Sequence, residues 1–187
     1  RQKYQGAPWL YDETTGDSVG VKDPDGSEFF FARAAHYGYF ANSGSQTATA
    51  NTPTVMEFDT VAIDDGIIIS AGTKIILPRA GIYNFTLTAQ IENVDSQIHE
   101  LNLWGRLNGD DIPGTATRVA VTESHGGTPG ANVLERSYMA EVNDGDYIEV
   151  VWMVSDANVS LEPTASTESP AMPSGPSAIL MVSEVAR

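Results

Sequence analysis

Hydrophobic and polar residues alternate along much of the chain. The clearest run is 81–91, where every second residue from Tyr83 to Ile91 is apolar and the residues between them are Asn, Thr or Gln. This period of two is typical of an antiparallel strand with one buried face. Similar patterns predict four further strands, at 100–108, 132–142, 147–155 and 177–185.

Turn residues separate these segments at intervals of roughly 8–12 residues. Asn108-Gly109 and Asn143-Asp144-Gly145 contain residues that tolerate the positive φ of tight hairpin turns. Residues 165–176 are rich in Ser, Thr and Pro, which predicts a long surface loop before the last strand. Because helical periodicity is nearly absent, the pattern predicts an all-β sandwich or barrel.

The segment 147–155 differs from the other strands because both of its faces are apolar. A strand of this kind needs cover on both sides. Either it lies centrally in a sandwich beneath a loop, or its second face packs against another subunit, and both interpretations stay open. The second makes the protein an oligomer, and its candidate interface residues are Tyr147, Val151, Trp152 and Met153.

The first 33 residues are predicted to be a separate β-meander, followed by the main domain at 34–187. Three short runs, at 9–11, 19–21 and 29–31, are separated by turn residues. Strands of about three residues cannot enclose a core, so the meander either caps the main domain or docks on a partner. The candidate attachment residues are Trp9, Tyr11, Phe29, Phe30 and Phe31.

The chain is strongly acidic, with 25 acidic and 10 basic residues among 187 and a formal net charge of −15. Such a surface repels phosphate backbones and anionic lipids, which argues against nucleic acid or a membrane as the direct partner. The chain has no cysteine, which excludes disulfides and thiolate chemistry. The first residues lack the apolar stretch of a signal peptide, so we expect cytoplasmic synthesis without export by the usual route.

The sequence offers few groups for catalysis or metal binding. The three histidines have no second histidine at the i+3 or i+4 spacing of a helical metal site. No Gly-x-Ser-x-Gly turn positions a nucleophile. The pairs Asp64-Asp65 and Asp110-Asp111 are interpreted as solvated turn residues, because adjacent carboxylates splay apart. We therefore expect no catalytic residue, no cofactor and no metal site, with only a weak surface cation site conceivable at 23–28.

Three segments carry a resemblance to a known fold. They are Leu77-Pro78-Arg79-Ala80-Gly81-Ile82-Tyr83-Asn84-Phe85, Gly145-Asp146-Tyr147-Ile148-Glu149-Val150 and Ala178-Ile179-Leu180-Met181-Val182. In this order they resemble the aromatic strand, the late Gly-Asp strand and the closing strand of the jelly roll found in tumour necrosis factor and complement globular heads. The resemblance implies an antiparallel jelly-roll sandwich.

A second resemblance extends from about residue 6 to the end of the chain. Its motifs are Gly6-Ala7-Pro8-Trp9-Leu10-Tyr11-Asp12, Thr15-Gly16-Asp17, Asp23-Pro24-Asp25-Gly26-Ser27-Glu28-Phe29, Gln46-Thr47-Ala48-Thr49, Ala80-Gly81-Ile82-Tyr83-Asn84-Phe85, Leu107-Asn108-Gly109-Asp110-Asp111-Ile112-Pro113 and Gly145-Asp146-Tyr147-Ile148-Glu149-Val150-Val151-Trp152. Together they resemble a domain of virion structural proteins from tailed phages, notably phages of aquatic bacteria. This resemblance implies a homotrimer without a cofactor, built into the particle.

The resemblance leads to a specific expectation. The chain has no shaft repeat before its globular domain, which favours a capsid decoration (cement) protein that contacts the major capsid protein or another virion protein. The alternative is a short tail fibre or receptor-binding tip that presents the loops 122–131 and 162–176 to a host glycan. A polysaccharide-degrading spike is disfavoured because no convincing acid pair is present. We expect a non-enzymatic protein of the virion, on the capsid surface in preference to the tail.

Overall fold

The computed structural model describes residues 21–22, 28–29 and 35–186. The chain divides into two compact units, Arg1–Ala35 and His36–Arg187. In the first unit β1 (Val21–Lys22) pairs antiparallel with β2 (Glu28–Phe29). The candidate attachment residues Trp9, Tyr11, Phe30 and Phe31, and most of the candidate cation site at 23–28, lie outside the described residues.

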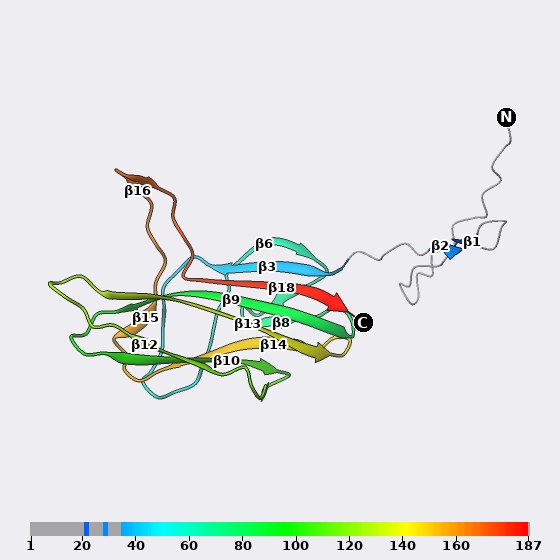
Figure 1. The fold of residues 1–187 in the computed structure, drawn as a ribbon, viewed down its shortest axis with the longest axis horizontal. Helices are drawn as coiled ribbons and strands as arrows, with labels where there is room; N and C mark the ends of the chain where they lie inside the picture. Colours follow the sequence, from blue (N-terminus) through cyan, green and yellow to red (C-terminus); the bar gives the residue numbers. More distant parts are fainter. Residues whose placement is uncertain (1–20, 23–27, 30–34, 187) are drawn as a thin grey trace. The chain divides into compact units, whose positions relative to one another are not determined.

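The second unit is a sandwich of two antiparallel sheets (Figure 1). The first layer has the strand order β4-β15-β9-β18-β3-β6, and β13 pairs with β9 along its whole length. The strands of this layer are β3 (Tyr37–Asn42), β4 (Gln46–Thr47), β6 (Thr60–Asp65), β9 (Gly81–Asn93), β13 (Gly130–Val142), β15 (Val159–Leu161) and β18 (Ala178–Ala186).

The second layer has the order β11-β10-β14-β8-β7, with β12 beside β10 and β5 beside β14. A separate two-stranded hairpin is formed by β16 and β17. The strands outside the first layer are β5 (Thr54–Val55), β7 (Ile68–Ser70), β8 (Lys74–Ile76), β10 (His99–Leu107), β11 (Asp110–Asp111), β12 (Thr117–Val121), β14 (Tyr147–Val154), β16 (Thr167–Glu168) and β17 (Ala171–Met172).

All five strands predicted from alternation are present, as β9, β10, β13, β14 and β18. The predicted turn at Asn108-Gly109 is also present, with φ of 52° and 93°. The loop expected at 165–176 is instead a hairpin, because β16 and β17 pair there. Asp64 and Asp65 are not turn residues either, since they end the strand β6 and pair with β3.

The core lies between the two layers. Alternate residues of β9, from Tyr83 to Ile91, are at most 1% exposed. They belong to one cluster with Leu103 and Trp152 of the opposite layer. Burying a large apolar side chain stabilises a fold by about 1.5–3 kcal/mol, so the alternation of β9 fixes which face turns inward.

The doubly apolar strand β14 lies in the interior of its sheet. It pairs with β10 on one side and with β8 and β5 on the other. Both Val151 and Trp152, which point to opposite faces, have no exposed surface within a single chain. Of the two interpretations of this strand, its central position is confirmed.

Tyr138 of β13 reaches across the sandwich to the second layer. Its ring stacks on Phe85, with centroids 5.2 Å apart. The hydroxyl points at Gly105 of β10, where an added Cβ would lie 2.5 Å from the Tyr138 oxygen. Gly105 is therefore required for close approach, and the buried Tyr138 hydroxyl has no hydrogen-bond partner. Burial raises the pKa of Tyr138 well above its usual range.

Replacing Gly105 should therefore destabilise the sandwich. We expect Gly105→Ala to lower the free energy of unfolding by about 1–3 kcal/mol, because the new methyl group overpacks the space held by Tyr138. Urea denaturation followed by tryptophan fluorescence measures the change. Gly44→Ala is the control, since the closest atom to its added Cβ is 3.6 Å away. Equal stability of the two variants would contradict this account.

Candidate functional site

The first layer has one face that points away from the core, which we call the outer face. It is built by the three adjacent strands β9, β18 and β3. Its residues are Asn84, Thr86, Thr88, Ile179, Met181, Ser183, Tyr37, Tyr39 and Ala41. These central residues are uncharged, although the whole chain carries a net charge of −15. At the margins of the same face lie the carboxylates Glu92, Glu135, Glu141 and Asp65.

The polar groups of the outer face bond to one another. In the strand register Thr86 lies between Ser137 of β13 and Met181 of β18. The hydroxyl oxygens of Thr86 and Ser137 are 2.9 Å apart, and the Asn84 amide donates to Thr86 Oγ1 at 3.3 Å. Neutral groups already bonded within the sheet are easier to remove from water than charged groups.

Exposed apolar side chains accompany these neutral groups. Met181 is 44% exposed at the centre of the outer face, and Tyr37 is 47% exposed at its end. On the two flanking strands, Met139 is 63% and Ile63 is 60% exposed. Met181, Tyr39 and Ile63 are neighbours in the strand register, and exposed apolar surface of this kind is typical of a site of protein contact.

The edge of the first layer is open at β13. This 13-residue strand pairs with β9, and the described residues contain no strand paired to its other side. Its outward side chains include Glu135 and Glu141, which are both exposed. Charges on an edge strand discourage pairing with a further strand. Both carboxylates lie on the margin of the outer face, opposite Thr88 and Ile82, so the uncharged centre of this face is a better contact surface than the β13 edge.

The hairpin of β16 and β17 projects beyond the other strands of the sandwich (Figure 1). Gln90 of β9 fixes both of its stems, because its Nε2 donates to Pro176 O at 2.6 Å and its Oε1 accepts from Thr164 Oγ1 at 2.6 Å. Beyond these stems, residues 165–174 are all exposed. A two-stranded hairpin is marginally stable by itself, so a contact on a partner would stabilise it.

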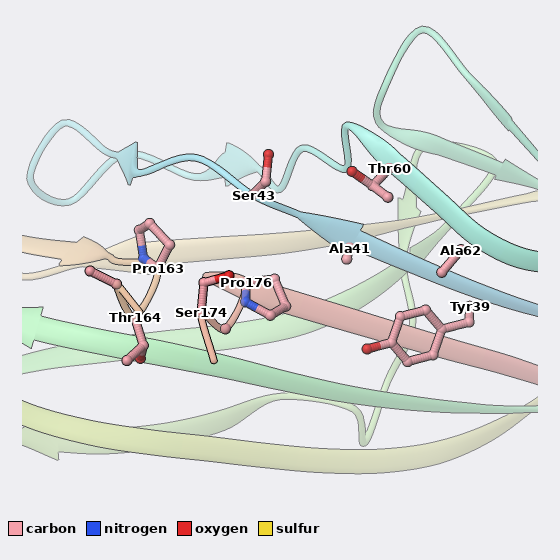
Figure 2. A pocket seen from close by; sticks show the side chains of 11 residues that line it. Tyr39, Ala41, Ser43, Thr60, Ala62, Pro163, Thr164, Ser174 and Pro176 are labelled. Atoms are coloured by element: carbon pink, nitrogen blue, oxygen red, sulfur yellow. The ribbon is translucent and has the colours of Figure 1, made fainter. Parts of the chain in front are cut away.

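A hollow lies where this hairpin leaves the outer face (Figure 2). Tyr39 and Ala41 of β3 form one side of it, and Pro163 and Pro176 of the hairpin stems form the other. The side chains that line the hollow carry no charge. The hollow thus extends the neutral surface toward the hairpin.

A buried ion pair between Arg79 and Glu184 lies near the C-terminal end of β18. Arg79 donates through Nε to Glu184 Oε1 at 2.7 Å and through a second nitrogen to Oε2, while the His36 N–H donates to Oε2 at 3.1 Å. The two side chains are 12% and 5% exposed. Burial would raise the pKa of Glu184, but the bonds from Arg79 and His36 outweigh it and lower this pKa below the usual range.

The candidate interface predicted from β14 needs correction. Val151 and Trp152 have no exposed surface, so these two predictions are wrong, because a side chain enclosed within one chain cannot contact a second. Tyr147 and Met153 are half-buried. The Tyr147 ring already has Lys74 Nζ 4.2 Å from its centroid.

The residues considered for catalysis and metal binding lie apart. His125 is exposed in the loop before β13, and His36 Nδ1 is 2.8 Å from Asp65 O. Asp111 is not a free turn residue, because its Oδ1 accepts from Trp104 and Arg106.

Asp95 and His99 were not predicted as a pair of possible metal ligands, because the spacing rule applied to the sequence concerns two histidines. The pair has i,i+4 spacing, with His99 Nε2 2.8 Å from Asp95 Oδ2.

Comparison of the sequence with protein-family models gives no match, and comparison with curated proteins gives none either. No helix among the described residues is long and apolar enough to cross a membrane. The outer face and the sequence motifs therefore form the basis of the functional proposal.

The Arg79–Glu184 pair generates a pH-dependent prediction. Glu184→Gln should lower the free energy of unfolding by about 3 kcal/mol at neutral pH, because Arg79 stays buried without its counter-charge. The folded-state pKa of Glu184 lies below its ordinary value of 4.5. The stabilisation is therefore present above pH 4.5 and is lost as pH falls through the lowered pKa. Urea titrations at several pH values should show the difference between wild type and variant shrinking in acid.

The control for this series is Glu100→Gln. Glu100 is 45% exposed and lies 3.5 Å from Arg118. Solvent-exposed pairs contribute about 0–1 kcal/mol, so this variant should behave like the wild type at every pH. A Glu184→Gln variant with unchanged stability at neutral pH would refute the role of the buried pair.

Proposed function

We propose that this chain is a non-enzymatic structural protein of a tailed-phage virion, in which three jelly-roll domains associate through their outer faces and decorate the capsid. The observation that carries the proposal is the uncharged, partly apolar centre of the outer face on a strongly acidic chain. The sequence motifs that resemble phage virion proteins supply the biological setting.

The strand order supports the jelly roll. The first layer contains β3-β18-β9-β13, and the second contains β8-β14-β10-β12. The chain crosses between the layers from β8 to β9, from β9 to β10, and again from β13 to β14. Antiparallel strands divided between two sheets in this way are typical of a double-sheet jelly roll.

The composition of the outer face supports self-association. Its centre, around Met181, Thr86 and Tyr39, combines apolar side chains with neutral groups that bond within the sheet. The cores of homo-oligomer interfaces are apolar and poor in charge. The exposed hairpin at 165–174 rises beside this surface and would lie close to a neighbouring copy.

Attachment to the particle is assigned to the first 33 residues. The division of the chain into the units Arg1–Ala35 and His36–Arg187 supports a segment that is separate from the sandwich. Its aromatic residues, including Trp9 and Tyr11, suit an anchor on another protein. A trimer bound across several capsid subunits stabilises the shell, because it binds the assembled lattice in preference to free subunits.

The alternative is a short tail fibre or receptor-binding tip. The observation that favours it is the projecting hairpin at 165–174, which is exposed throughout. Loops carried on a rigid sandwich are common sites of recognition. In this function the hairpin, with the loop 122–131, would contact a host glycan.

A charge placed in the outer face should break the trimer. We expect the wild type to have three times the chain mass of 20.0 kDa, and Met181→Glu to raise the concentration needed for association about 100-fold or more. The reason is that each copy would bury a new unpaired carboxylate against like-charged neighbours. Sedimentation velocity measures both.

The matched control is Ile68→Glu, which changes an apolar residue of similar exposure, 55%, in the second layer. It should leave the mass unchanged. A wild type that is monomeric at micromolar concentration would refute the trimer. Loss of association in the control but not in Met181→Glu would place the contact on the second layer.

Removal of residues 1–33 tests whether this segment attaches the protein to the virion. The copy number of the full-length protein tests whether it belongs to the capsid or to the tail. The shortened chain should still form trimers but should be missing from virions that incorporate the full-length protein. Quantitative mass spectrometry of purified virions should find hundreds of full-length copies. A handful of copies would favour the tail alternative, and normal incorporation of the shortened chain would refute the anchor.

A further inference from the structure

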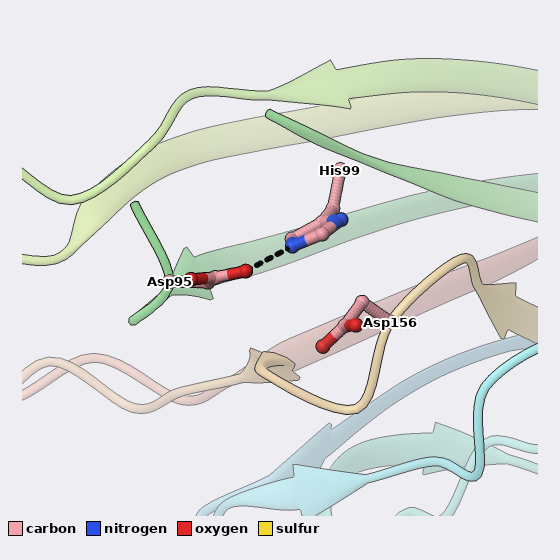
Figure 3. A group of neighbouring side chains, drawn as sticks. All are labelled: Asp95, His99 and Asp156. Carbon is pink, nitrogen blue, oxygen red and sulfur yellow. Dashed lines mark hydrogen bonds and ion pairs between the residues drawn. The ribbon is translucent and has the colours of Figure 1, made fainter. Parts of the chain in front are cut away.

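Three potential metal ligands meet at one end of the sandwich (Figure 3). Asp95 lies in the turn between β9 and β10, His99 is the first residue of β10, and Asp156 lies in the turn between β14 and β15. One ligand atom from each residue lies within 4.8 Å of the other two. The side chains of His99 and Asp95 are only 15% and 31% exposed.

Hydrogen bonds fix the two turns independently of any ligand. The Asp95 N–H donates to Asn93 Oδ1 at 3.0 Å, and Asp95 O accepts from Ser124 N at 2.7 Å. Asp156 Oδ1 accepts from both nitrogens of Asn158 at 2.9 Å, whereas Oδ2 takes part in neither bond. The Asp95 carboxylate is held by Ser96 N–H on Oδ1 and by His99 on Oδ2. In a metal complex Asp95 Oδ2 and His99 Nε2 would exchange their mutual hydrogen bond for the ion.

The negative charge of the Asp95 and Asp156 carboxylates favours a bound cation. Two carboxylates held this close repel each other. The Asp95–His99 pair explains the position of two of the side chains, but it gives Asp156 no partner of opposite charge. A divalent ion bound by all three would balance both carboxylates.

The ligand types select the metal. An imidazole nitrogen with two carboxylate oxygens suits zinc and related first-row ions, whereas calcium and magnesium prefer oxygen ligands alone. Zinc bonds of about 2.0–2.2 Å in a tetrahedron place ligand atoms about 3.3–3.6 Å apart. The three atoms are close enough to reach these positions by side-chain rotation.

We propose that Asp95, His99 and Asp156 bind one divalent transition-metal ion of the zinc class. Both turns connect the two layers, since β9 and β15 belong to the first and β10 and β14 to the second. The ion therefore links the β9–β10 and β14–β15 connections, which both pass between the layers at the same end of the sandwich. It stabilises the fold by mass action, because the unfolded chain does not hold the three ligands together.

Calorimetric titration of the chelator-treated full-length chain with zinc chloride tests the proposal. We expect one zinc per chain, and a melting temperature raised by about 5–10 °C at a zinc concentration about 100 times the dissociation constant. In a nitrogen–proton correlation spectrum, the imidazole resonances of His99 should move while those of His36 and His125 stay.

Two variants remove ligands in different ways. Asp156→Asn keeps an acceptor for Asn158 but removes the carboxylate, and His99→Ala removes the nitrogen ligand. Each should weaken zinc binding at least about 10-fold, and the melting temperature without zinc reports whether the variant is folded. The matched controls are Asp110→Asn and His125→Ala, which alter exposed residues outside the cluster and should bind like the wild type.

Zinc binding that persists unchanged in folded Asp156→Asn would overturn the site, because the ion would then be held elsewhere. Absence of binding by the wild type, or movement of His36 or His125 in place of His99, would overturn it as well. None of these outcomes depends on the oligomeric state or on attachment to a virion.

Discussion

The burial of one face of β9 against the second layer is the interaction on which the rest of the structure depends. The long strand lies between β13 and β18, so its orientation fixes the orientation of both neighbours. Once Phe85 and Leu87 face Trp152 in the core, Thr86 and Met181 must face the other way. The outer face is thus a direct consequence of the same alternation that builds the core.

Strands with strict alternation were predictable because their pattern is local. β9 and β10 need no knowledge of their neighbours, and the Asn108-Gly109 turn follows from the φ values that these residues tolerate. Strands without alternation were missed. The six residues of β6 are all exposed, so no apolar period marks this strand, and its existence depends on pairing with β3.

The candidate site was harder to predict because it belongs to several strands at once. In a single strand, Thr86 is only a polar residue on the solvent side. The uncharged centre of the outer face becomes apparent only when β9, β18 and β3 lie next to each other. For the same reason Asp156 could not be joined to His99, since about 57 residues separate them in sequence and only the fold brings their turns together. The sequence pattern of the second apolar face of β14 is the same whether its own chain or a partner covers it, which is why Val151 was wrongly assigned to an interface.

The acidity of the chain limits how copies can associate. In the proposed trimer, three copies would bring together three times the charge of −15, and such repulsion is strongest for carboxylates within a screening length of about 8 Å at physiological ionic strength. Pairing through the edge of β13 would place Glu135 and Glu141 close to a neighbouring chain. Contact through the outer face keeps these groups at the margin, where water and ions screen them. The charge distribution therefore favours a compact assembly whose acidic rim stays in solvent or meets a basic surface on another protein.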